Sequence, residues 1–166
     1  AINVDSIFFA VLLAIVFGGS FWLVARKASA GVPGRGQNFV ELLSFTDEKA
    51  EENFSHFSSV AKALDAALSG AELPHRTSLV PHAPYSISPK TFEMINQATK
   101  DQVISIHNQE HPAEDELYKT GGGEYLCFFK IFGIDHSPFP ITGKSSIRSV
   151  LPHFNNGQTI FLIHNT

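Results

Sequence analysis

The sequence contains a single cysteine, Cys127, and no excess of basic residues. One cysteine excludes an internal disulfide framework and a zinc site built from thiolates. The formal net charge of −4 leaves no basic face to neutralise phosphates, so nucleic acid is not expected as a partner. Histidine is better represented, with eight residues, and imidazole is a common ligand of catalytic transition metals.

Neither end of the chain has the usual features of a natural terminus. The sequence starts at Ala1 without an initiator methionine, and it stops within an apolar, strand-like run that ends at Thr166. On these features we expect a fragment of a longer protein.

The first segment is apolar, because no charged residue occurs between Asp5 and Arg26. About 20 residues in a helix extend about 30 Å, the thickness of the hydrocarbon core of a bilayer. Trp22 and the basic residues that follow it are typical of a membrane interface and a cytoplasmic flank. The prediction is a transmembrane helix over residues 6–25, with a signal peptide and a buried core helix as alternatives.

The pattern changes after a turn at residues 31–36, which is rich in glycine and proline. Apolar runs then alternate with segments of helical periodicity. Strands are predicted at residues 38–43, 78–81, 102–106 and 159–163. Helices are predicted over residues 47–68 with Thr46 as the cap, from Pro89 with Ser88 as the cap, and over residues 112–119, 124–132 and 145–151.

This alternation indicates an α/β fold of consecutive βα units on a parallel sheet. A closed TIM-type barrel needs eight such strands in about 250 residues, so the four predicted here make about half a barrel or a small open sheet. The chain therefore divides into residues 1–37, with the apolar helix and the turn, and residues 38–166, with the partial barrel.

Three predicted strands are each followed at once by a histidine, namely His82, His107 and His164. In a parallel βα barrel the active site forms at the carboxyl ends of the strands. A single histidine there is more often structural than a ligand, but three at equivalent ends would converge on one mouth. The other five histidines fall on predicted helices or loops and are interpreted as non-ligands.

Glu110 follows His107 by three residues and is placed to move a proton beside a metal site. Alone, this spacing is weak, because a solvated loop glutamate has the same pattern. Glu114 is expected in the charged first turn of the next helix. Residues 142–146, Thr-Gly-Lys-Ser-Ser, imitate the end of a phosphate-binding loop, but Pro138 stands where that motif requires glycine.

Four strings together resemble the amidohydrolase superfamily, in the branch of cytosine-deaminase-like and chlorohydrolase-like enzymes. They are His-Ala-Pro-Tyr-Ser at 82–86, Ser-Ile-His-Asn-Gln-Glu at 105–110, Pro-Ile-Thr-Gly-Lys-Ser at 140–145 and Leu-Ile-His-Asn-Thr at 162–166. The resemblance implies a divalent metal, zinc by expectation, with His107 and His164 as ligands. It also implies that Glu110 shuttles protons and that His82 contacts a small-molecule substrate.

The resemblance implies a hydrolase of C–N bonds, deaminase-like and cytoplasmic. Two features of the family are missing: the paired His-x-His after its first strand and the aspartate after its eighth. With two of about four ligands an open site holds metal weakly, so this chain alone is expected to be inactive.

The beginning of the chain resembles a different family, the first membrane helix of subunit a of the F-type ATP synthase. The resemblance covers about residues 1–43, including Ile-Asn-Val-Asp-Ser-Ile-Phe-Phe at 2–9 and Gly-Val-Pro-Gly at 31–34. It implies an alternative function as a membrane component of the proton-translocating synthase, located in the inner membrane. Because both resemblances fit residues 37–43, the hypothesis is a chimera of two genes; a membrane-anchored hydrolase is the alternative.

Overall fold

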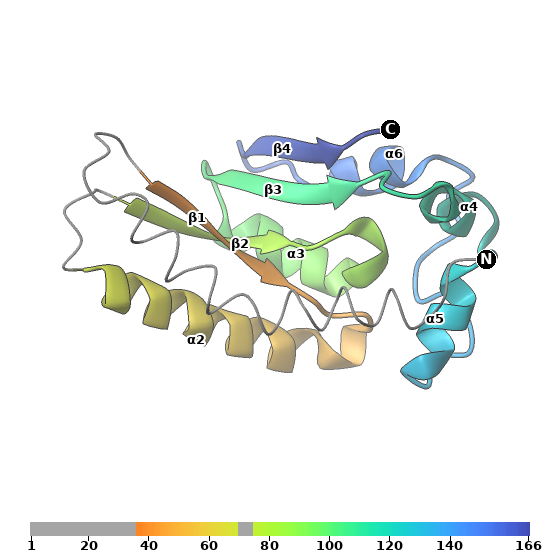
Figure 1. The fold of residues 1–166 in the computed structure, drawn as a ribbon, viewed down its shortest axis with the longest axis horizontal. Coiled ribbons are helices and arrows are strands. Elements are labelled where there is room, and N and C mark those ends of the chain that lie inside the picture. Colours follow the sequence, from red (N-terminus) through yellow and green to blue (C-terminus); the bar gives the residue numbers. More distant parts are fainter. Residues whose placement is uncertain (1–35, 70–74) are drawn as a thin grey trace. The chain divides into compact units, whose positions relative to one another are not determined.

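A computed structural model describes residues 36–69 and 75–166 of the chain (Figure 1). The elements in chain order are β1 (Gly36–Leu42), η1 (Asp47–Lys49), α2 (Ala50–Leu68), β2 (His75–Pro81), η2 (Pro84–Ser86), α3 (Pro89–Ala98), β3 (Val103–Asn108), α4 (Pro112–Thr120), α5 (Tyr125–Ile131), α6 (Ser146–Val150), η3 (Leu151–His153) and β4 (Thr159–His164). The fold is mixed α/β, as predicted, and the four predicted strands are all present.

All strand pairs in the described part of the chain are parallel. β1 pairs with β2 in a register that places Glu41 opposite Val80, and β3 pairs with β4 with His107 opposite Ile163. The two pairs meet at their carboxyl ends, where the His107 amide donates a hydrogen bond of 2.9 Å to the carbonyl of His82. The strands therefore follow one another in chain order, as in consecutive βα units.

The helices begin where their sequences favour a start. At α3, the Ser88 hydroxyl accepts a hydrogen bond from the Thr91 amide, and Pro89 occupies the first helical position. Helix α4 follows the same rule, because the His111 ring accepts from the Ala113 amide before Pro112 opens the helix. Helix α3 thus begins after the η2 turn that follows β2, and α4 begins after the short loop that follows β3, so both starts lie near the strand edge that carries the candidate site.

The start of the first long helix differs from the prediction. Residues 47–49 form a 3-10 turn, α2 begins at Ala50, and Thr46 is extended without a side-chain capping bond. The Asp47 carboxylate accepts a hydrogen bond of 2.9 Å from the Lys90 amide instead. Asp47 therefore accepts a hydrogen bond from the first turn of α3 and does not cap the first turn of its own helix.

The core lies between the strands and the helices that follow them. Leu42, Ile106 and Phe92 are almost fully buried in one cluster with Leu117 and Phe129. Burying side chains of this size contributes about 1.5–3 kcal/mol each, which orients each strand with one face toward the helices. The opposite face is then free to carry polar groups.

Strand β4 is the exception to this burial. Its apolar side chains Phe161, Leu162 and Ile163 remain 54%, 36% and 38% exposed. Within the described ranges β4 pairs with β3 alone, so its other edge has unpaired backbone groups.

The predicted transmembrane helix over residues 6–25 lies outside the described residues. In residues 36–69 and 75–166, no helix combines the length and the apolarity needed to cross a bilayer.

Candidate active site

The three predicted histidines and one unpredicted glutamate gather at the carboxyl ends of the strands. His82 follows β2 directly, His107 is the penultimate residue of β3, and His164 is the last residue of β4. Glu41 is the penultimate residue of β1 and lies beside Val80 in the register. Because alternate residues of a strand face the same side, Glu41, Val80 and His82 share one face.

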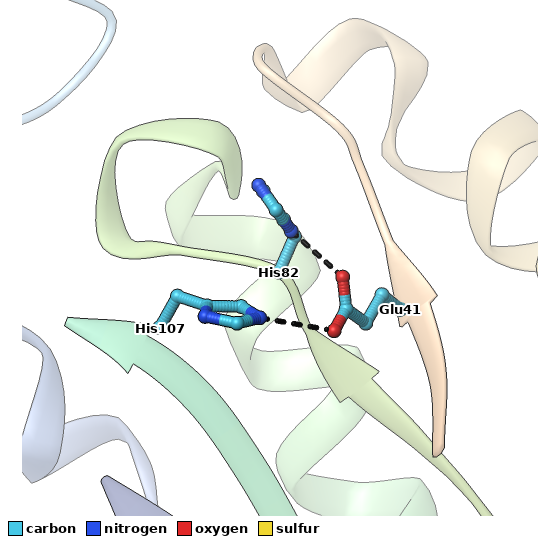
Figure 2. A group of neighbouring side chains, drawn as sticks. All are labelled: Glu41, His82 and His107. Carbon is cyan, nitrogen blue, oxygen red and sulfur yellow. Dashed lines mark hydrogen bonds and ion pairs between the residues drawn. The ribbon is translucent and has the colours of Figure 1, made fainter. Parts of the chain in front are cut away.

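The Glu41 carboxylate bridges two of these histidines, as Figure 2 shows. Its Oε2 lies 2.8 Å from His82 Nδ1, and its Oε1 lies 3.1 Å from His107 Nε2. The two rings are neighbours with centroids 5.3 Å apart. One carboxylate therefore holds side chains from β3 and from the segment after β2 in a single group.

The electrostatics of this group follow from the bridge. Burial alone would raise the pKa of Glu41, but the hydrogen bonds from His107 and His82 outweigh it and lower the pKa to about 2. The same hydrogen bond to Glu41 raises the pKa of His107. The bridge thus favours a negative Glu41 beside a ring that can carry positive charge.

The predicted metal ligands, His107 and His164, also lie together. His107 Nδ1 is 3.2 Å from His164 Nε2, on the side of the ring away from Glu41. Two nitrogens that bind one tetrahedral zinc ion at about 2.1 Å lie about 3.4 Å apart. The spacing and the imidazole donors of this pair therefore fit a shared divalent metal.

Glu110 lies at the edge of this pair. Its Oε1 is 3.8 Å from His164 Nε2, and its side chain is 54% exposed. Gln109, just before it, has a φ of 52°, in the left-handed region that turns the chain sharply after β3. That turn directs the loop back across the strand ends and brings Glu110 toward β4.

Sequence reasoning missed Glu41. It was contained in the run at residues 38–43, interpreted as an apolar buried strand, although a carboxylate within such a run was a usable signal. Val40 and Leu42 on either side are buried, so alternation places Glu41 on the opposite face. Among the described residues, Glu41, His82 and His107 are the one group of three metal-capable side chains whose ligand atoms lie within 4.8 Å of one another.

Glu114 lies in the first turn of α4, as predicted, but it is not solvated. Its side chain is fully buried, and Oε1 accepts a hydrogen bond of 3.0 Å from the Gln109 amide. Burial raises the pKa of this carboxyl. Glu114 therefore supports the loop that carries Glu110 and is not part of the charged surface expected for it.

Two hollows lie away from the strand-end histidines His82, His107 and His164. One of about 420 Å³ lies at the amino ends of the strands and is lined by Gln37, Asp65, His75 and Arg76 among others. A second is formed by loops around Thr46 and Asp135. Both are open and polar. The strand-end group is the better candidate site, because chemistry in parallel βα folds is concentrated at the carboxyl edge.

The fold and the site together define an α/β protein with parallel strands and a histidine-rich carboxyl edge. The chain resembles a solved structure, the aminofutalosine deaminase of Helicobacter pylori, with a TM-score of 0.51 and 22% sequence identity. The similarity covers 72% of this chain and 28% of the deaminase chain. It shows a shared fold and confirms the mixed α/β architecture with parallel strands.

Curated relatives point to a second family. ATP synthase subunit a of Idiomarina loihiensis is 53% identical over 55 residues, which are 32% of this chain and 21% of that protein. Subunit a of Vibrio cholerae is 46% identical over 54 residues, covering 32% of this chain and 20% of that protein. The subunit of Psychrobacter cryohalolentis is 40% identical over 65 residues, covering 39% and 23%.

No protein-family model matches the chain. The chain spans about a fifth of the length of the curated relatives it matches and 28% of the deaminase. The comparisons thus find a shared fold with a deaminase over 72% of the chain and sequence similarity to ATP synthase subunit a over about a third of it.

Proposed function

We propose that residues 38–166 belong to a metal-dependent hydrolase that acts on a C–N bond of a small molecule, in the manner of a deaminase. The observation that carries the proposal is the pair of strand-end nitrogens, His107 Nδ1 and His164 Nε2, 3.2 Å apart. The deaminase-like fold supports it. In this proposal His107 and His164 hold a divalent metal, for which zinc is the expected ion.

A divalent ion bound by these histidines supplies the Lewis-acid charge that makes water a nucleophile near neutral pH. The protein contributes the positions around it. Glu110, 3.8 Å from His164, is placed to take a proton from water and to deliver it to the leaving nitrogen. His82 binds the substrate beside them. Hydrolysis then forms a bond from the water oxygen to carbon and breaks the C–N bond, and the nitrogen leaves as ammonia or an amine.

Metal binding tests the proposal directly. Calorimetric titration of the metal-free full chain with zinc should show one weak site, which His107→Ala and His164→Ala each remove. His56→Ala is the matched control, because His56 is exposed on α2. Unchanged zinc affinity in both site variants, with the fold retained, would exclude these ligands.

Activity provides a separate test. When residues 38–166 are joined to barrel strands that supply further metal ligands, ammonia release should fall at least 100-fold in Glu110→Gln, the range typical of losing a proton shuttle. Full activity in that variant would remove Glu110 from the mechanism. The hydrolase part is proposed to be cytoplasmic.

The second candidate function is that of an ATP synthase subunit a component, favoured by the 53% identity over 55 residues. In that case the matched stretch, which is longer than the 43 residues of the predicted resemblance, defines the protein, and residues 6–25 place it in the inner membrane. A junction of two genes is proposed near residues 37–43, where the two resemblances overlap. Long single-molecule DNA reads through codons 30–50 test this: molecules that carry both halves support one gene, and their absence shows an artificial joint.

A further inference from the structure

The bridging carboxylate of Glu41 restricts the protons on two rings. A carboxylate at neutral pH only accepts hydrogen bonds, so each nitrogen that faces it must carry a hydrogen. His82 Nδ1 at 2.8 Å and His107 Nε2 at 3.1 Å are therefore both donors. Each oxygen serves one ring, and neither ring can turn its bare nitrogen toward Glu41 without losing its bond.

The opposite nitrogen of each neutral ring is then an acceptor. For His107 this is Nδ1, the atom that faces His164 Nε2 at 3.2 Å. For His82 it is Nε2, which points away from Glu41 in Figure 2. The lone pairs of both rings thus lie on the sides away from the carboxylate.

We infer that Glu41 is a positioning residue, which sets the tautomers and orientations of His107 and His82 so that one presents Nδ1 to a metal and the other presents Nε2 to substrate. The inference rests on the proposed function for the metal and for the substrate. Glu41 itself touches neither the metal nor the reacting atoms.

This role of Glu41 agrees with the way in which metal-binding histidines are held in other proteins. Metal-binding histidines generally donate their second ring hydrogen to a carboxylate or carbonyl, which orients the ring and strengthens the ligand. Glu41 does this for His107 and, with its second oxygen, also for His82. A neutral His82 held in this way accepts a hydrogen bond at Nε2. The substrate group that meets it is therefore an N–H or O–H donor, such as the amino group expected in a deaminase substrate.

The competing arrangement places a metal among Glu41, His82 and His107 themselves. Two ligand atoms on one tetrahedral ion lie about 3.4 Å apart, whereas Oε2 of Glu41 and Nδ1 of His82 are 2.8 Å apart. That is the length of a charge-assisted hydrogen bond. Such a metal would also use Nε2 of His107 and leave Nδ1 beside His164 without a role.

Nitrogen NMR of the histidines tests the inference without any assay of activity. In the metal-free full chain, labelled with ¹⁵N-histidine at pH 8, His107 should appear as the Nε2–H tautomer and His82 as the Nδ1–H tautomer. On addition of zinc, the metal-induced shift should fall on His107 Nδ1. The opposite tautomer of either ring, or a zinc shift on His107 Nε2, would overturn the inference.

The variant Glu41→Gln adds a second readout. A glutamine amide has one accepting oxygen, so only one of the two rings keeps its bond and the other changes tautomer. Zinc affinity should fall 10- to 100-fold, the usual effect of removing the carboxylate partner of a metal-binding histidine. Glu51→Gln is the matched control, because it removes an exposed carboxylate of α2 that pairs with Lys90. It should leave zinc affinity and both tautomers unchanged.

The outcomes separate this inference from the proposed function. If zinc binds the folded Glu41→Gln chain as tightly as the natural one, the metal site stands and the role of Glu41 falls. If zinc does not bind at all, but the two tautomers are as expected and change in Glu41→Gln, the proposed function fails and the positioning of the rings is supported.

Discussion

Two carboxylates near the same strand ends, Glu41 and Glu114, have opposite properties. Glu41 is 39% exposed, and both of its oxygens accept hydrogen bonds from histidines, so its pKa is lowered to about 2. Glu114 is fully buried, and its Oε2 has no hydrogen-bond partner among the described residues. Its pKa is raised, because burial disfavours the charged form.

The difference shows that hydrogen-bonding partners decide whether a half-buried or buried carboxylate stays charged: they outweigh burial at Glu41 and do not outweigh it at Glu114. Two ring donors keep Glu41 ionised at the edge of the strands. At Glu114, inside the protein, the hydrogen bond from the Gln109 amide does not offset the effect of burial. The site therefore combines a charged carboxylate that orients side chains with a carboxylate of raised pKa that supports a loop.

The largest effect is expected when the ring of His107 is removed, because it contacts both Glu41 and His164. In His107→Ala, Glu41 loses one donor, and the proposed metal loses one ligand. Zinc affinity should fall at least 100-fold, about 3 kcal/mol or more. Calorimetry measures the loss, with His56→Ala as control. A fall of less than 10-fold would assign the metal elsewhere.

Acid pH should reduce the contribution of Glu41 to the stability of the fold. Because the folded pKa is lowered from 4.5 to about 2, the stability that Glu41 contributes is present above pH 4.5 and is lost as the pH falls toward 2. After a discount for exposure, we expect about 1–2 kcal/mol. Urea unfolding of the metal-free chain at pH 3 and pH 6 measures it, and Glu41→Gln should abolish this part of the difference.

The contribution of His107 to stability depends on pH in the opposite direction. The raised pKa of His107 contributes stability that is fully present below its ordinary value of 6.5 and is lost as the pH rises through the folded value. The bridge is therefore most stabilising between the two titrations. Equal slopes for the natural chain and Glu41→Gln across both ranges would contradict the bridge.

The uncharged helix cap Ser88 provides a reference for the pH dependence of the two carboxylates. Ser88 is buried and accepts from the Thr91 amide at the start of α3. Ser88→Ala should cost about 1 kcal/mol at every pH between 4 and 8, because no charge is involved. Chemical denaturation measures it. A cost that varies strongly with pH would show that the α3 start is coupled to the charged groups.

The smallest change at acid pH is expected for Glu114→Gln, since glutamine keeps the acceptor for the Gln109 amide and nearly the same volume. The raised pKa of Glu114 means that its stabilising contribution is present below pH 4.5 and is lost as the pH rises through the folded value. The variant should therefore gain stability relative to the natural chain with rising pH. A relative loss would show that Glu114 is held ionised.

The positions of the elements could be predicted from local sequence. Ser88 with Pro89 marks a helix start, and β-branched runs mark β3 and β4, because these signals act within a few residues. The histidines at the strand ends could be predicted as well, because the topology of a parallel βα fold brings the carboxyl ends of its strands to one edge. Their roles as ligands and substrate contacts remain predictions.

The roles that could not be predicted belong to residues whose hydrogen-bond partners lie far away along the sequence. The role of Glu41 arises from register with β2 and from a ring on β3, 66 positions away along the chain. The Asp47 carboxylate likewise serves the start of α3 instead of its own helix. Pairings of this kind are decided by packing across elements, which single-sequence patterns do not encode.

Strand β4 has a consequence for handling the protein. In the part of the chain that the structure describes, the edge of β4 away from β3 is unpaired, and with exposed Phe161, Leu162 and Ile163 it is a template for strands from other molecules. Neither proline nor a charged side chain interrupts β4 to discourage such growth. The chain should therefore associate edge to edge as its concentration rises, and a lysine at Leu162 would act as a gatekeeper against that assembly.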